Sequence, residues 1–153
     1  MTRYRPPASS EGTRRRMSRQ SRRDTGPELA LRRVLHRRGL RYRLHRRPLP
    51  GRRLTVDLVF SSAMVAVEVR GCFWHACPQH GTSPQANAEW WREKLTGNRA
   101  RDERAAGLLA DAGWTLVVVW EHEDPDEAAD KVAAAVRERT SSWSGVSSVG
   151  RVG

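Results

Sequence analysis

Two apolar segments separated by only three residues place the tightest constraint on the fold. They span residues 54–60 and 64–70, and Ser61-Ser62-Ala63 joins them. So short a connection permits an antiparallel hairpin but not the crossover that parallel neighbours require. A third segment, residues 114–120, is almost continuously apolar, which predicts a central strand buried on both faces. The three segments together predict a small sheet.

Helical patterns before and after these segments predict the layers that cover the sheet. The first helix is expected to begin after Thr25, a candidate N-cap, with Glu28 placed to complete a capping box, and to end at Gly39. A long helix is expected over about residues 87–111, and a last helix begins at Pro125. The order α-β-β-α-β-α predicts an α/β fold in which helices flank a mixed central sheet.

Length and composition predict one domain with a basic arm and a polar tail. The chain has 153 residues, and the domain is expected over residues 24–139. Residues 1–23 are basic and residues 140–153 are rich in Ser and Gly, so both ends are expected to be disordered. No apolar run approaches the roughly 18 residues that span a bilayer, and no signal peptide is visible, which predicts a soluble intracellular protein.

The net charge of +11 is concentrated in the first third of the chain. Residues 1–53 contain 18 arginines and three acids, whereas the remaining 100 residues contain 10 Lys and Arg and 14 acids. A coding bias towards arginine explains part of the excess, but it would not confine the charge to one end. The polarised charge therefore predicts a polyanionic partner, and arginine can bind phosphate and guanine through two hydrogen bonds.

The segment 71–80 contains both cysteines of the chain and two of its five histidines. Cys72 and Cys77 are five residues apart, and His80 follows closely. In an intracellular protein this spacing favours metal ligands over a disulfide, and two sulfur ligands with a histidine are typical of zinc. His75 lies between the cysteines and can act separately.

The adjacent aromatic residues Phe73 and Trp74 offer flat apolar surfaces next to the predicted metal site. Side chains of this kind insert between DNA bases or stack on them. A metal site that fixes a histidine and two aromatic residues in one place is compatible with a DNA-cutting site.

Asp57 is an acid inside an otherwise apolar strand, and the next strand carries Glu68 and Arg70 two residues apart, on one face. An aspartate followed on the neighbouring strand by Glu-x-basic is the pattern of PD-(D/E)xK nucleases, whose acids bind Mg²⁺ at the scissile phosphate. The alternative is a buried ion pair of Arg70 with either acid. The pattern alone does not decide between the two.

Several short motifs recur in a characteristic order along the chain. They are Leu49-Pro50-Gly51, Asp57, Gly71-Cys72-Phe73-Trp74-His75, Trp91, Asn98-Arg99-Ala100-Arg101-Asp102, Gly113-Trp114 and Trp120-Glu121. From about residue 17 to residue 123, the chain resembles the very short patch repair (Vsr) endonucleases. The resemblance implies a restriction-endonuclease-like PD-(D/E)xK fold. It also implies an Mg²⁺-dependent enzyme that nicks double-stranded DNA 5′ to the thymine of T·G mismatches left by deamination of 5-methylcytosine.

The resemblance also implies roles for individual residues. Asp57 would be the metal-binding acid, and His75 the general base or water activator. Asp102 would be a second acid that orients a histidine or a water molecule, with an exposed helix residue as the alternative. Glu28 would be an acid near the metal, a role that is compatible with its place in the capping box.

Zinc in this family has four ligands, and the resemblance places Cys72, Cys77, His80 and His122 at or near them. Such a Cys₂His₂ set leaves no open position, which predicts a structural zinc ion. The remaining two histidines, His36 and His45, lie in arginine-rich stretches and are expected to be solvated.

The expected DNA contacts come from the arm and from aromatic residues. Met17, Phe73, Trp74 and Trp91 match intercalating or stacking residues of the family, and the arm adds Arg19, Arg22 and Arg23. Adjacent residues on a helix diverge by about 100°. One of Trp90 and Trp91 is therefore expected in the core, while the other meets DNA.

Two positions depart from the family pattern. Arg70 stands where the best-known members have histidine, which shifts proton transfer to His75, and Glu68 stands where an apolar residue is expected, which can supply a second metal-binding acid. The alternatives are a related nuclease with a restriction or defence target, or a zinc-braced DNA-binding module with impaired catalysis. The resemblance further implies a monomer in the bacterial cytoplasm, on the nucleoid, with mismatch-repair accessory proteins as possible partners.

Overall fold

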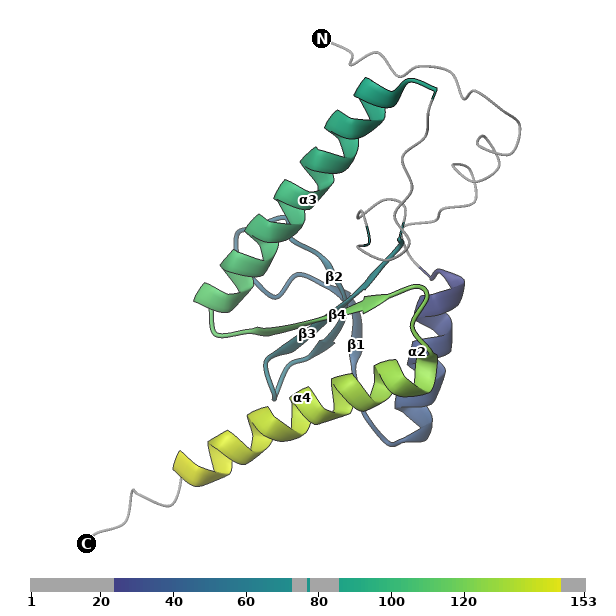
Figure 1. The fold of residues 1–153 in the computed structure, drawn as a ribbon. Helices are drawn as coiled ribbons and strands as arrows, with labels where there is room; N and C mark the ends of the chain where they lie inside the picture. The colour runs from purple at the N-terminus through teal and green to yellow at the C-terminus, as the bar shows by residue number, and fades with distance from the viewer. Residues whose placement is uncertain (1–23, 73–76, 78–85, 147–153) are drawn as a thin grey trace, which may run out of the picture.

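The computed structural model describes residues 24–72, 77 and 86–146 (Figure 1). Three helices surround one four-stranded sheet within the described residues. In chain order the elements are α2 (Gly26–Arg37), β1 (Arg43–Arg46), β2 (Val56–Phe60), β3 (Val65–Arg70), α3 (Ala88–Asp111), β4 (Thr115–Trp120) and α4 (Pro125–Val146). The α/β class expected from the sequence is therefore confirmed.

The sheet is mixed, with the strand order β1-β2-β3-β4. Strands β1 and β2 are antiparallel, and β2 and β3 form the antiparallel hairpin that the short connection predicts, with Phe60 paired with Val65. Strand β4 is parallel to β3, and the two stay in register from Val65 with Thr115 to Arg70 with Trp120. The carboxyl ends of β3 and β4 consequently lie side by side.

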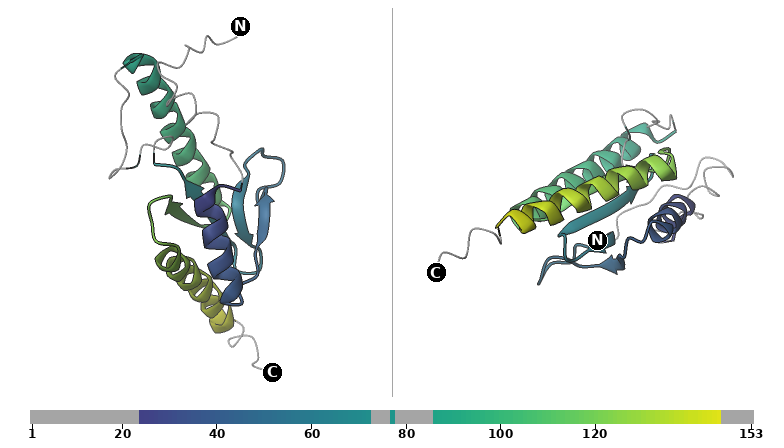
Figure 2. Two further views of the ribbon diagram at one scale, coloured as in Figure 1. Left: turned by 90° about the vertical axis from the view of Figure 1, so that its right-hand side faces the viewer. Right: turned by 90° about the horizontal axis from the view of Figure 1, so that it is seen from below.

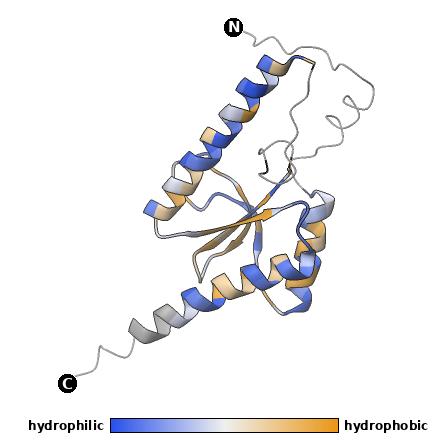
Figure 3. Cartoon of the chain, in the orientation of Figure 1, coloured by the Kyte–Doolittle hydropathy of each residue, from blue (hydrophilic) through white to orange (hydrophobic). Residues whose placement is uncertain are grey.

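Helices cover both faces of the sheet (Figure 2). Helices α2 and α4 pack on one face, where their buried residues join those of the strands; the helix residues are Leu31, Val34, Leu35, Ala128, Ala129 and Val132. On the other face, Leu109 of α3 packs against Val59 and Ala66. Figure 3 shows hydrophobic colours along much of β3 and β4, whereas β1 is mostly hydrophilic. Within the described residues no helix is long and apolar enough to cross a bilayer.

The first helix begins and ends where its sequence predicts. Thr25 is the N-cap, and its hydroxyl accepts a hydrogen bond from the backbone N–H of Glu28 at 3.4 Å. The Glu28 carboxylate bonds instead to the N–H of Asp24, one residue before the cap, at 2.7 Å. Gly39 has φ +80°, a left-handed conformation that glycine adopts at low cost, just beyond the helix end. The cap thereby fixes Glu28 at the first turn of α2.

Strand β1 was not expected from the sequence. Its four residues, Arg-Leu-His-Arg, lack the apolar alternation that marks a half-buried strand, and only one of them is hydrophobic. Pairing with β2 forms it. Because β1 is an edge strand, its arginines can remain in solvent.

Strand β4 lies at the edge of the sheet, so the expectation of a central strand is wrong. The strand is apolar because helices cover its two faces: Val117 and Val119 face the core with α4, and Leu116 packs towards α3. Its outer edge is partly capped by Lys131, whose ammonium group donates to the carbonyl of Val118 at 2.7 Å. An apolar strand sequence indicates that both faces of the strand are covered. It does not distinguish an edge strand from a central strand.

The last helix is longer than expected. Helix α4 continues to Val146, whereas the sequence predicted the domain to end at residue 139 and a tail to begin at residue 140. Residues 1–23 and 147–153 lie outside the described residues, so the arm and the remainder of the tail stay expectations.

Candidate active site and metal-binding residues

Asp57 lies half-buried on β2, and its carboxylate accepts a hydrogen bond from the backbone N–H of Val69 on β3 at 2.7 Å. Burial raises the pKa of Asp57 from 3.8 to about 7, and the nearby acids Glu28 and Glu68 add to the rise against the effect of the Val69 N–H. A carboxylate with a raised pKa beside other acids is typical of a site that binds a cation or transfers a proton.

Glu28 brings a second carboxylate to this position from α2. Its side chain is 2% exposed. One oxygen, Oε2, accepts the Asp24 N–H, whereas the buried Oε1 has no hydrogen-bond donor among the described residues. The same carboxylate acts on the pKa of Asp57, so the two acids are neighbours although they lie 29 residues apart in the sequence.

The pair Asp57 and Glu28 fits a divalent cation. A buried carboxylate oxygen without a donor is costly unless an ion or a proton neutralises it. Oxygen ligands from carboxylates are those that Mg²⁺ prefers. The donor set is therefore appropriate for Mg²⁺, and it draws on α2 and β2, which the cap and the hairpin hold in place.

Glu68 and Arg70 form an ion pair on β3. The Nε and Nη2 atoms of Arg70 donate to Glu68 Oε2 at 3.1 and 2.9 Å, and the two side chains, Arg70 and Glu68, are 13% and 16% exposed. The ion-pair alternative is thus found for Glu68. The pair does not exclude Glu68 from the site, because its charge still raises the pKa of Asp57.

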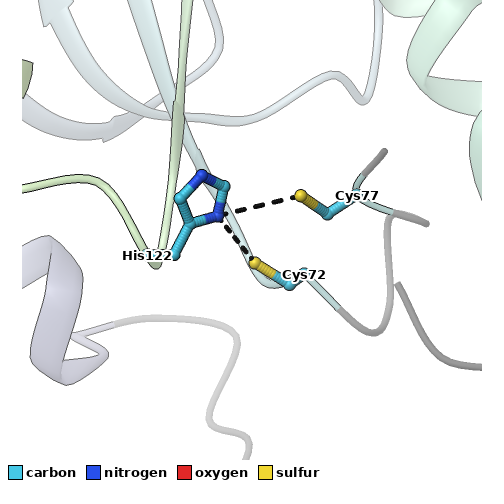
Figure 4. A group of neighbouring side chains, drawn as sticks. All are labelled: Cys72, Cys77 and His122. Atoms are coloured by element: carbon cyan, nitrogen blue, oxygen red, sulfur yellow. Dashed lines mark hydrogen bonds between the residues drawn. The ribbon is translucent and has the colours of Figure 1, made fainter. Parts of the chain in front are cut away.

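A second cluster forms where β3 and β4 end. Cys72 and His122 each follow the last residue of their strand by two positions, and the parallel register of those strands brings them together. The Cys72 Sγ lies 3.1 Å from His122 Nδ1, and the Cys77 Sγ lies 3.7 Å from the same nitrogen (Figure 4). The predicted convergence of these three residues is what the structure shows.

Backbone hydrogen bonds hold the loop of this second cluster. The N–H of Cys77 donates to the carbonyl of Cys72 at 2.9 Å, and the N–H of Cys72 donates to Glu121 Oε1 at 2.9 Å. Burial, followed by the neighbouring Cys77, raises the pKa of the Cys72 thiol to about 11.

The second cluster fits a soft metal ion. All three ligand atoms lie within 4.8 Å of one another, and two sulfurs with one imidazole nitrogen match the ligands of zinc. The fourth expected ligand, His80, lies outside the described residues.

His45 departs from the expectation of a solvated histidine. Its side chain is 16% exposed, and its two ring nitrogens face carboxylates: Nε2 lies 3.4 Å from Asp24 Oδ1, and Nδ1 lies 4.0 Å from Glu28 Oε1. Sequence reasoning missed it because β1 was not recognised. Its own segment carries no strand signal from which that strand could have been predicted. His36, by contrast, is exposed as expected.

The other expected site residues are only partly within the described part of the chain. Asp102 lies half-buried on α3. Trp91 is 5% exposed and packs edge to face against Trp90, with ring centroids 4.8 Å apart. Of the two tryptophans, Trp91 is therefore the buried one in this structure, and its contact with DNA stays a prediction. The expected residues outside the described ones are Met17, Arg19, Arg22, Arg23, Phe73, Trp74, His75 and His80.

The fold resembles that of a known endonuclease domain. The catalytic domain of the homing endonuclease I-Bth0305I superposes with a TM-score of 0.52 over 76% of this chain and 98% of that domain, at 18% sequence identity. At that identity the likeness concerns the fold. It agrees with the restriction-endonuclease-like α/β fold that the sequence predicts.

Sequence comparisons identify the family. Residues 9–80 match the family model of the DNA mismatch endonuclease Vsr. The type II nicking enzyme V.NaeI of Lentzea aerocolonigenes is 42% identical over 133 residues, which cover 86% of this chain and 78% of that protein. The DNA mismatch endonuclease Vsr of Escherichia coli K12 is 36% identical over 101 residues, covering 65% of this chain and 62% of that protein. The chain belongs to the Vsr family, which confirms its interpretation as a DNA endonuclease.

Proposed function

We propose that this chain is an Mg²⁺-dependent nicking endonuclease of very short patch repair, which cuts 5′ to the thymine of T·G mismatches. The observation that carries the proposal is the pair of buried acids, Asp57 and Glu28, in a chain of the Vsr family. A resident Mg²⁺ ion would supply charge stabilisation at the scissile phosphate. Asp57 and Glu28 would hold that ion.

We assign phosphate-charge stabilisation and proton transfer to other side chains. Glu68 holds Arg70 through two hydrogen bonds, so the guanidinium is positioned to stabilise phosphate charge. Arginine stays protonated at neutral pH and is unsuited to accept a proton. We therefore assign proton transfer to His75, with Asp102 as the acid that orients it.

A structural zinc ion would brace the loop that carries His75. Cys72, Cys77 and His122 would supply three ligands and His80 the fourth. Closing the loop with the ion would fix His75 relative to Asp57, which lies on the strand paired with β3.

DNA binding is proposed for the arm and the aromatic residues. Met17, Phe73, Trp74 and Trp91 would insert into the duplex or stack on its bases, and Arg19, Arg22 and Arg23 would bind phosphates. The protein would act as a monomer on DNA in the bacterial cytoplasm, where mismatch-repair accessory proteins are candidate partners.

A panel of duplexes tests the proposal. Duplexes with a T·G mismatch, with other mismatches and with full pairing are incubated with the protein and Mg²⁺, with and without EDTA, and the cut sites are mapped. Nicks 5′ to the mismatched thymine that EDTA abolishes are expected. Equal nicking of the fully paired duplex would refute mismatch specificity.

A second candidate function follows from the names of the relatives. V.NaeI, and V.XorIIP of Xanthomonas oryzae, which is 45% identical over 105 residues covering 67% of this chain and 74% of that protein, are both named type II nicking enzymes. In this second function the nuclease would serve a restriction or defence system, and the preferred sequence around the mismatch would coincide with a methylation site. Failure to nick any duplex would favour a DNA-binding module with impaired catalysis.

A further inference from the structure

His45 lies between Asp24 and Glu28, and Glu28 is one of the two proposed metal ligands. The histidine lies on β1 between residues that pair with Leu58 and Val56 of β2, which places it across from Asp57. Its ring nitrogens face different carboxylates, Nε2 towards Asp24 Oδ1 at 3.4 Å and Nδ1 towards Glu28 Oε1 at 4.0 Å. Within the described residues, the His45 imidazole is thus the side chain of β1 that approaches the buried Oε1 of Glu28.

The backbone of this group is unusual. His45 has φ +48° and Asp24 has φ +54°, a left-handed conformation that few residues other than glycine adopt. A residue in this conformation within a strand redirects its side chain, as at a bulge. Departures of this kind gather at sites where the surrounding structure demands a particular side-chain direction.

A separate cation site at Asp24, Glu28 and His45 is the first alternative, because their ligand atoms lie within 4.8 Å of one another. The guanidinium of Arg32 argues against it. Arg32 Nη1 lies 2.6 Å from Asp24 Oδ1 and 3.6 Å from Glu28 Oε2. Its positive charge therefore already forms ion pairs with both acids. A second cation in the same place would be repelled.

The two carboxylate oxygens of Glu28 therefore have different surroundings. Oε2 is held by the Asp24 N–H and the charge of Arg32, whereas Oε1 has no donor among the described residues and lies 4.0 Å from His45 Nδ1. The Glu28 carboxylate as a whole neighbours Asp57. The oxygen that is left available for a cation is the one beside the imidazole.

We propose that His45 is a positioning residue of the catalytic metal site: the Nδ1 side of its ring, 4.0 Å from Glu28 Oε1, orients the Glu28 carboxylate that neighbours Asp57. The proposal rests on the proposed function in so far as Asp57 and Glu28 are the ligands. Residues that orient metal ligands typically contribute 10- to 100-fold in metal affinity. Without the Nδ1 side of His45, cation binding should therefore weaken although every ligand is still present.

Two substitutions separate the two ring nitrogens. The amide nitrogen of asparagine is bonded to Cγ, like Nδ1, whereas that of glutamine lies one atom further out, like Nε2. His45→Asn thus retains a donor towards Glu28 and also tolerates a positive φ. His45→Gln retains a donor towards Asp24 alone. His36→Gln is the matched control, because His36 is exposed on α2.

The measurement is Mn²⁺ binding, followed by the loss of the free-ion EPR signal, with zinc content checked in each variant. We expect His45→Gln to bind Mn²⁺ roughly 10- to 100-fold more weakly than wild type. His45→Asn should stay within about threefold of wild type, and His36→Gln should be unchanged. Unchanged affinity in His45→Gln, or an equal loss in His45→Asn, would overturn the proposal.

Nicking supplies an independent readout. His45→Gln should need roughly 10-fold or more Mg²⁺ for half-maximal nicking and approach the wild-type rate at saturating Mg²⁺. A merely structural role would lower the melting temperature without moving the Mg²⁺ requirement. If wild-type protein nicks no duplex, the proposed function fails, whereas the Mn²⁺ comparison still decides the role of His45.

Discussion

Asp57→Asn is expected to stabilise the metal-free protein while abolishing nicking. Burial and the neighbouring acids raise the pKa of Asp57 from 3.8 to about 7. Each pKa unit corresponds to about 1.36 kcal/mol. The shift of about three units therefore means that ionised Asp57 destabilises the folded protein by about 4 kcal/mol. The asparagine carbonyl can still accept the Val69 N–H, and its amide is a donor for the neighbouring Glu28 carboxylate. Relaxation reduces the gain, so we expect about 2 to 4 kcal/mol at pH 8.

The pH dependence has a definite sign. Between pH 3.8 and about 7, the folded protein keeps a proton on Asp57 that the unfolded chain releases. The stability of the wild-type protein due to this group is therefore fully present below pH 3.8 and is lost as the pH rises through about 7. Asp57→Asn lacks this loss, so the difference between the two proteins should grow over that window.

Urea unfolding of the zinc-loaded protein in buffer without Mg²⁺, at pH 4.5 and pH 8, measures the effect. Asp111→Asn is the matched control, because Asp111 is exposed at the end of α3, and it should change stability by less than about 0.5 kcal/mol. Added Mg²⁺ should stabilise the wild type but not Asp57→Asn. An Asp57→Asn protein that is less stable than the wild type at pH 8 would refute the reasoning from burial and acid repulsion.

Three further predictions concern the zinc cluster, the arm and proton transfer. Cys72→Ser should lose the single Zn²⁺ ion per chain and the cooperativity of unfolding, as measured by elemental analysis and thermal denaturation; wild-type protein without zinc would contradict this. Deletion of residues 1–16 should reduce the slope of log affinity against log salt by about 0.9 for each DNA phosphate that the shortened arm no longer neutralises, while nicking at saturating DNA stays nearly constant; an unchanged slope would mean that the arm does not touch DNA. His75→Ala should lower the nicking rate at saturating DNA by roughly 10²-fold or more but retain zinc; loss of zinc in His75→Ala together with its retention in His80→Ala would exchange the two roles.

The parts of the fold that local chemistry determines were predictable. The three-residue connection predicted the hairpin of β2 and β3, and Thr25 with Gly39 predicted the ends of α2. The spacing of Cys72 and Cys77 predicted one shared metal site, whereas the convergence of His122 with them followed from the family resemblance.

The parts that depend on non-local pairing were not predictable. β1 exists because β2 offers a partner, and its own four residues carry no strand signal. The place of His45 beside Glu28 follows from that pairing and was missed with it. The edge position of β4 was missed because cover by α3 and α4 makes an edge strand as apolar as a central one.

The central claim is that Asp57 and Glu28 bind the cation on which mismatch-directed nicking depends. Nicking of a T·G duplex, measured for wild type, Asp57→Asn and Glu28→Gln across an Mg²⁺ titration, tests it most directly. Wild type should give EDTA-sensitive nicks 5′ to the mismatched thymine. Asp57→Asn should give no nicks, and Glu28→Gln should need more Mg²⁺, while both variants still bind the duplex. Wild-type nicking by Asp57→Asn would contradict the claim.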